Sequence, residues 1–231
     1  MRTFLLAASA LAALASPAAA ATRNFAITSF TKVRIEGPYK VMLATGVAPF
    51  AKATGSATAL DRVAIETRGD TLLVHADPNA WGGYPGEDPG PVEITIGTHD
   101  LSNVALTGAG SLAINRVKGL SFGLSVLGSG AVEIDDVAAD QMEVAIAGTA
   151  SARLRGRANH LAATLRGLSS LDAANLASHD VEITAQGSAT VAASATNTAR
   201  IDASGPATIR LSGRPSCTLK VTGSTSVSGC R

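Results

Sequence analysis

Aromatic and charged residues are both scarce in this sequence, and each shortage narrows the choice of fold and function. Of the 231 residues, 3% are aromatic and 16% are charged, with 19 Lys and Arg against 18 Asp and Glu. This balance lacks the basic excess of a nucleic-acid-binding protein, and 46% hydrophobic residues exclude a disordered chain. The length allows a large buried core. We expect one all-β domain, and the shortage of aromatic residues predicts that its core is thin and aliphatic.

Long apolar runs are also missing, apart from a short one at the N-terminus. Arg2 precedes an apolar run that Pro17 interrupts, and small residues follow up to Ala20. This pattern predicts a secretory signal peptide over residues 1–20, because a membrane anchor needs about 18 or more apolar residues. Cleavage there would leave equal numbers of basic and acidic residues. We expect the mature chain, residues 21–231, to be periplasmic or secreted, with no transmembrane segment.

Cysteine is scarce too, since Cys217 and Cys230 are the only two. An exported chain meets an oxidising compartment, where such a pair normally forms a disulfide. Closing a loop of about 14 residues would stabilise the fold by about 3 kcal/mol. A redox or metal role would favour a Cys-x-x-Cys spacing or a neighbouring histidine, and neither is present. We therefore predict a disulfide.

Glycine, in contrast, recurs regularly in the second half. Each of these glycines is followed by small residues, and the intervals are 18–20 residues: Gly108, Gly128, Gly148, Gly167, Gly187, Gly205 and Gly223. Apolar residues stand two and four positions before each glycine and four positions after it, with mostly polar or small residues between them. A fixed period near 20 with two-residue alternation predicts a parallel β-solenoid whose glycines form corners.

Charged residues at equal offsets should stack in successive turns, about 4.8 Å apart. Opposite charges then meet in cross-turn ion pairs: Glu133 with Arg153 and Asp172, Asp135 with Arg155, Glu182 with Arg200, and Asp202 with Lys220. Each exposed pair is worth only about 0.2–1 kcal/mol. We therefore expect these residues to favour the correct register and solubility rather than to catalyse a reaction.

The first half predicts an irregular N-terminal cap. The residues around Gly37 repeat the corner pattern, so we expect them to form the opening turn. Residues 62–66 and 71–75 flank a Gly-Asp turn, which predicts a β-hairpin. Segment 21–103 would thus hold the first turn with an inserted hairpin and loop, ahead of the regular repeats of 104–231.

Several segments together resemble a known family. They are residues 30–37, 69–74 and 92–96, combined with the Gly-small-small corners. In the order of these segments and in its period near 20, the chain resembles the head GIN domain family of "putative autotransporter adhesins". The resemblance covers almost the whole mature chain. The resemblance implies an exported bacterial β-solenoid, and it supplies no catalytic, cofactor-binding or metal-ligating residues.

Two exposed segments are candidate interaction sites. Arg68-Gly69-Asp70 is a tripeptide that animal adhesion receptors read, although Gly-Asp also suits the hairpin turn, which we favour. Trp81 and Tyr84 belong to a loop rich in proline and glycine. They could stack on a sugar ring or anchor a partner, or they could pack as a lid over the first turns.

A possible metal column involves three residues that each lie twelve positions after a glycine: Asp140, His160 and His179. Stacked together, they could bind a metal ion. One interval in this stretch is a residue shorter, however, so the three could equally lie out of register. We predict no metal site and no cofactor.

The leading functional hypothesis is a non-enzymatic binding or structural protein of the bacterial cell envelope. Small outward residues three positions before each glycine could form a flat face that meets a polysaccharide or a second copy, or they could equally form an ordinary solvated surface: Ala105, Ser125, Ala145, Thr164 and Thr184. One alternative is a polysaccharide lyase or hydrolase, which needs converging carboxylates such as Glu133, Asp135, Asp136 and Asp172. Another is a periplasmic assembly factor with a protein partner.

Overall fold

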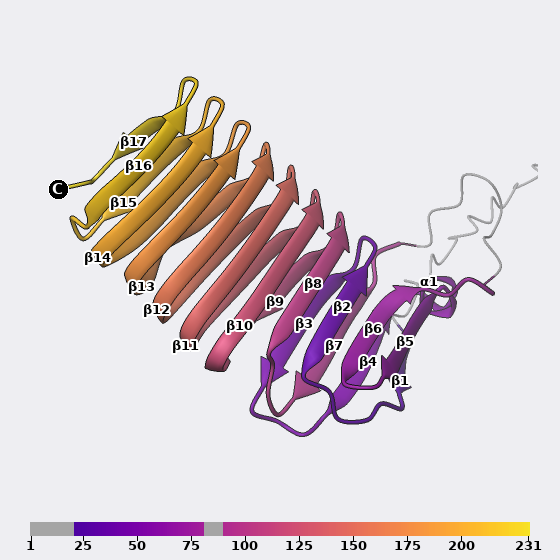
Figure 1. Cartoon of the computed structure of the whole chain (residues 1–231). Coiled ribbons are helices and arrows are strands. Elements are labelled where there is room, and N and C mark those ends of the chain that lie inside the picture. The colour runs from indigo at the N-terminus through magenta and orange to yellow at the C-terminus, as the bar shows by residue number, and fades with distance from the viewer. Residues whose placement is uncertain (1–20, 81–89) are drawn as a thin grey trace, which may run out of the picture.

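The computed structural model of the protein describes residues 21–80 and 90–231. The predicted signal peptide, residues 1–20, lies outside the described residues. Seventeen strands join in one continuous sheet, which winds into a parallel β-solenoid (Figure 1). Among the described residues, no helix has the length and apolar character needed to cross a membrane. The predicted fold class is confirmed.

The strands of the first half are short. They are β1 (Ala21–Phe25), β2 (Lys32–Glu36), β3 (Lys40–Thr45), β4 (Phe50–Gly55), β5 (Val63–Arg68), β6 (Thr71–Ala76), β7 (Glu93–Thr98), β8 (Asn103–Gly108) and β9 (Ser111–Ile114), with helix α1 (Ala57–Asp61) between β4 and β5. In the regular stack most strands run around much of a turn. They are β10 (Val117–Gly128), β11 (Ala131–Gly148), β12 (Ser151–Gly167), β13 (Ser170–Gln186), β14 (Thr190–Ser204), β15 (Thr208–Ser212), β16 (Ser216–Thr222) and β17 (Ser226–Ser228).

The predicted corner glycines stack in register. Gly128 pairs with Gly108 on one side and with Gly148 on the other. All eight corners, including Gly37, have φ between 88° and 127°, a region that favours glycine. A Cβ atom on Gly148 would also clash with the carbonyl oxygen of Gly128. Backbone conformation and close stacking therefore both demand glycine here.

The core is thin and aliphatic, as the composition predicts. Inward columns of Val, Leu, Ile and Ala fill the solenoid, and Leu106, Val126 and Ile146 stack in one such column. The buried aromatic residues in the described part of the chain are Phe30, Tyr39 and Phe122. Small and branched side chains therefore suffice to fill the interior between the walls of each turn.

The N-terminal part differs from the expected order of turns. We expected the Gly37 turn to open the stack, but β2 lies between β6 and β8, and β3 lies between β7 and β9. Strands β6 and β7 therefore form the outermost parallel layer, although they come later in the sequence. Their inward residues Leu72, Val74, Ile94 and Ile96 are fully buried, so this layer extends the same core.

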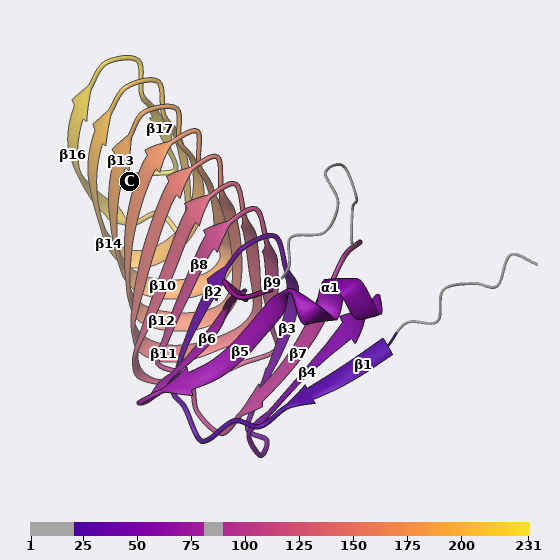
Figure 2. The same cartoon turned by 90° about the vertical axis from the view of Figure 1, so that its right-hand side faces the viewer.

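Antiparallel strands close this end of the solenoid (Figure 2). Strand β4 pairs antiparallel with β7 and with β1, while β5 pairs antiparallel with β6. Helix α1 lies between β4 and β5, and the hydroxyl of its N-cap residue Ser56 accepts a hydrogen bond from the Ala59 amide at 3.0 Å. The pairing of β5 with β6 is the predicted hairpin, and Arg68 pairs with Thr71 across its two-residue turn.

Candidate ligand-binding groove

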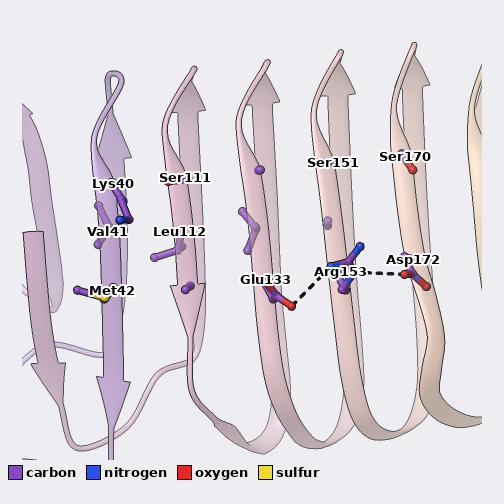
Figure 3. A pocket seen from close by; sticks show the side chains of 14 residues that line it. Lys40, Val41, Met42, Ser111, Leu112, Glu133, Ser151, Arg153, Ser170 and Asp172 are labelled. Carbon is purple, nitrogen blue, oxygen red and sulfur yellow. Dashed lines mark hydrogen bonds and ion pairs between the residues drawn. The ribbon is translucent and has the colours of Figure 1, made fainter. Parts of the chain in front are cut away.

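A shallow groove of about 390 Å³ crosses the outer face of the solenoid. It spans five neighbouring strands, β3, β9, β11, β12 and β13, on the side that follows the glycine corners (Figure 3). Its length therefore runs across the turns, parallel to the solenoid axis.

One wall of the groove is a column that we call the serine column, in which every residue after Lys40 is small. Its members pair in register from turn to turn: Lys40, Ser111, Ala131, Ser151 and Ser170. Each stands three positions after its corner glycine and next to an inward residue such as Leu112 or Val132. Alternation along the strand turns the column outward, and its small side chains leave the space that forms the groove.

The neighbouring column changes from apolar to charged along the groove. Met42 and Ala113 occupy one end, with Met42 43% exposed. Glu133, Arg153 and Asp172 occupy the other, where Arg153 lies 3.8 Å from Glu133 and 3.3 Å from Asp172 (Figure 3). One end can therefore contact an apolar surface, and the other presents paired charges.

The four predicted carboxylates, of which Glu133 and Asp172 line the groove, all pair with arginines. Arg155 Nη1 lies 2.9 Å from both Glu133 and Asp135, and Arg116 Nε lies 2.7 Å from Asp136. A glycosidase needs one carboxyl group free to protonate the leaving oxygen and a second that attacks or activates water. In this structure each of the four carboxyl groups has an arginine partner.

The other predicted ion-pair partners lie farther along the stack. Lys220 Nζ lies 3.2 Å from Asp202. Glu182 and Arg200 face each other in register, but no ion pair joins them in the described part of the chain. Strand register therefore places residues of opposite charge next to each other, but it does not by itself produce an ion pair.

The two histidines and Asp140 do not form one column. Asp140 accepts a hydrogen bond from Asn159 at 2.9 Å, whereas His160 pairs with Gln141 and with Asp180. Among the described residues, no group of three or more His, Cys, Asp or Glu side chains is placed to hold a metal ion. The shorter interval thus shifts His160 out of the column.

Asp180 has a different set of partners. Its Oδ1 accepts hydrogen bonds from the side-chain amide of Asn197 at 2.8 Å and from the Thr198 hydroxyl. These bonds, led by that of Thr198, hold the pKa of the carboxyl group below its ordinary value, with a smaller contribution from the charge of His160. The interactions join neighbouring turns at an exposed bend.

The Arg68-Gly69-Asp70 tripeptide lies at the hairpin tip. Gly69 has a φ of 63° and free space around it, which suits the turn. Arg68 contacts Glu66 at 2.5 Å, and Asp70 contacts Lys32 of β2 at 3.0 Å. Both charged side chains therefore already have partners within the fold.

Two further predictions concern the loop and the cysteines. Trp81 and Tyr84 lie outside the described residues. The predicted disulfide is confirmed, because Cys217 and Cys230 are bonded, with their Cα atoms 5.7 Å apart.

Sequence reasoning missed the role of Lys40, Met42 and Ser111 in the groove. The signal was available for Lys40 and Ser111, since both stand three positions after Gly37 and Gly108, respectively. The ion pair between Lys40 and Glu93, at 2.7 Å, could not be predicted from the offsets, because Glu93 belongs to β7 and β7 lies outside the regular repeat.

A family comparison agrees with this architecture. Residues 29–215 match the family described as "Putative auto-transporter adhesin, head GIN domain". The chain belongs to the head GIN domain family. No curated protein matches this chain.

Solved structures share the fold. A "putative adhesin" from Bacteroides fragilis superposes with a TM-score of 0.82 at 19% identity, covering 90% of this chain and 96% of that one. A "putative lipid binding protein" from Parabacteroides distasonis gives 0.72 at 18% identity, covering 90% and 95%. A "putative adhesin" from Parabacteroides merdae gives 0.67 at 16%, also covering 90% and 95%. At these identities the likeness shows that the four proteins share one fold.

Proposed function

We propose that the protein is an exported, adhesin-like binding protein of the bacterial cell envelope, and that its groove holds a polysaccharide chain. The groove across five turns is the observation that carries this proposal. Family membership supports the adhesin-like role, and the predicted signal peptide supports export.

The chemistry of the groove fits a sugar polymer. The hydroxyls of Ser111, Ser151 and Ser170 can donate and accept hydrogen bonds, as sugar hydroxyls do. The register spaces the turns about 4.8 Å apart, so the same type of contact recurs along the groove. Met42 supplies an apolar surface, and Lys40 supplies an ammonium group at the same end.

A binding experiment with one groove-filling variant tests the proposal. Purified protein is applied to an array of bacterial envelope polysaccharides and host glycans. Ser151→Leu places a larger side chain in the groove, and we expect it to weaken saturable binding at least about tenfold, or about 1.4 kcal/mol. Thr190→Leu is the matched control, because Thr190 continues the same column beyond the groove and pairs with Ser170.

The outcomes separate the alternatives. Binding lost in Ser151→Leu but kept in Thr190→Leu supports the groove. No saturable glycan binding, or equal loss in both variants, contradicts it. Release of shorter products from a bound glycan would favour the enzyme hypothesis, and Asp172→Asn should then abolish the release.

A further inference from the structure

The C-terminal end of the solenoid exposes strand edges, which we call the C-terminal edge, formed by β16 and β17 (Figure 1). Within the described residues, β16 pairs only with β14, and β17 pairs only with β15. Each strand therefore leaves backbone donors and acceptors on its outer side without a neighbouring strand. Open edges of this kind are templates for pairing with another chain.

The same end uncovers part of the apolar core. Leu219 and Val221 occupy the columns that are buried in the preceding turns, but they are 47% and 38% exposed. One turn earlier, their register partners Ile201 and Ala203 are 1% and 0% exposed. A further strand beside β16 would cover these side chains as β16 covers β14.

Lys220 is the only charged residue within β16 and β17, and the charged residues of the sequence around these two strands are basic as well. After Asp202 the sequence has no acidic residue, and it has four basic ones: Arg210, Arg214, Lys220 and Arg231. The ion pairs among the described residues include Lys220 with Asp202 and none of the other three. Lys220 remains 79% exposed despite that contact.

The C-terminal edge is also held in place before any partner arrives. The disulfide joins Cys217 in β16 to Cys230 after β17, and the Arg231 amide donates a hydrogen bond to the Pro215 carbonyl at 3.1 Å. A preordered edge loses less conformational entropy when it binds.

We propose that the C-terminal edge binds an extended acidic segment of a partner protein, which adds as a strand beside β16. Backbone hydrogen bonds would give affinity, and side chains on alternate residues would give specificity. Apolar side chains of the segment would cover Leu219 and Val221, while acidic ones would face Lys220. A symmetric dimer through this edge would instead place the same basic residues opposite one another, which disfavours a second copy.

The test uses two capped heptapeptides, one alternating Glu and Val and the other alternating Lys and Val. We expect the Glu-Val peptide to bind saturably in calorimetry, more weakly as salt rises, and the Lys-Val peptide not to bind. Lys220→Glu should weaken binding about tenfold, through loss of attraction and gain of repulsion. Arg166→Glu is the matched control, since it makes the same charge change at an exposed position in the middle of the stack.

Hydrogen exchange locates the peptide. Binding at the C-terminal edge should slow amide exchange in residues 216–222 and leave β1 and β5 unchanged. Circular dichroism confirms that each variant is folded, and Ser151→Leu should bind the peptide normally, which separates this proposal from the groove.

Three results would overturn the proposal. They are equal binding of both peptides, protection elsewhere in the chain, and absence of binding by a folded, monomeric protein. Concentration-dependent dimers that Lys220→Glu alters, seen by analytical ultracentrifugation, would show that a second copy occupies the edge.

Discussion

The two ends of this solenoid are finished in different ways. At the N-terminal end, β4 and β5 pair antiparallel with the outermost parallel strands, and α1 contacts β1, β4 and β5. At the C-terminal end, the parallel order continues to β16 and β17, and a disulfide closes the last turn. A change of strand direction ends the stacking pattern at one end, and a covalent bond stabilises the other end without covering it.

The difference matters because a solenoid is held together by contacts between neighbouring turns. An interior turn is stabilised from both sides, but the last turn has only one neighbour. The cap supplies the missing neighbour at the N-terminal end. At the C-terminal end, the exposed Leu219 and Val221 show that no equivalent cover is present among the described residues.

The largest expected effect compares a corner glycine of an interior turn with one of the last turn. Gly148→Ala should cost at least about 3 kcal/mol of unfolding free energy, because the Cβ would meet the Gly128 carbonyl and φ is 100°. Gly223→Ala has a similar φ of 91° but a nearest contact of 3.1 Å, so about 1–2 kcal/mol is expected. Denaturant unfolding followed by circular dichroism measures both. Equal losses would mean that backbone conformation alone controls the corners.

The second prediction concerns the covalent closure. Replacing both Cys217 and Cys230 by serine should cost about 3 kcal/mol in the last turn, since the unfolded loop of about 14 residues gains entropy. Because coupling runs only between neighbouring turns, hydrogen exchange should speed up in residues 205–231 and stay unchanged in β1 to β9. Faster exchange throughout the chain would show that the whole stack unfolds as one unit.

The third prediction, a smaller change in the free energy of unfolding, concerns a buried serine in the interior turns. Ser169 is 2% exposed, and its hydroxyl has no hydrogen-bond partner among the described residues. Alanines occupy the equivalent positions in the adjacent turns, so Ser169→Ala should raise the unfolding free energy by about 1 kcal/mol. Ser178→Ala is the control, since the Ser178 hydroxyl donates to the Leu176 carbonyl at 3.4 Å. It should stabilise less or destabilise, and a larger gain than at Ser169 would refute the argument.

The smallest effect is a titration at the N-terminal end. The hydrogen bond and charge of Lys32 hold the pKa of Asp70 below its ordinary value. The ionised carboxylate therefore favours folding above about pH 3.9, and this contribution is lost as pH falls through the lower folded pKa. In an NMR titration, Lys32→Met should raise the Asp70 midpoint and leave that of Asp180 unchanged. An unchanged Asp70 midpoint would contradict the assigned cause.

Much of the stack could be predicted because its rules are local. A glycine every 18–20 residues, with apolar residues at constant offsets, fixes which side chains point inward and which ones stack. The ladder of Glu133, Arg153 and Asp172 follows from that register. The sequence could not predict whether Asp140, His160 and His179 share a column. One interval is a residue shorter, and the position of the missing residue within the turn depends on the conformation of the bend.

The groove and the N-terminal cap could not be predicted from such local rules. Lys40 belongs to the serine column by offset, but the depth of the groove depends on how five turns pack beside each other. Strand β7 carries an ordinary alternating pattern, and nothing local indicates that it stacks on β3 outside the chain order.

The sequence by itself thus specifies the solenoid, its corners and its aliphatic core, because each depends on residues at constant offsets. It also specifies the disulfide, because the chain has only two cysteines. The order of the first turns, the antiparallel cap and the exposed C-terminal edge were decided by tertiary structure. They depend on which strands, distant in the sequence, come together. Hydrophobic burial favours any arrangement that covers the open core, so a local sequence pattern does not specify which arrangement forms.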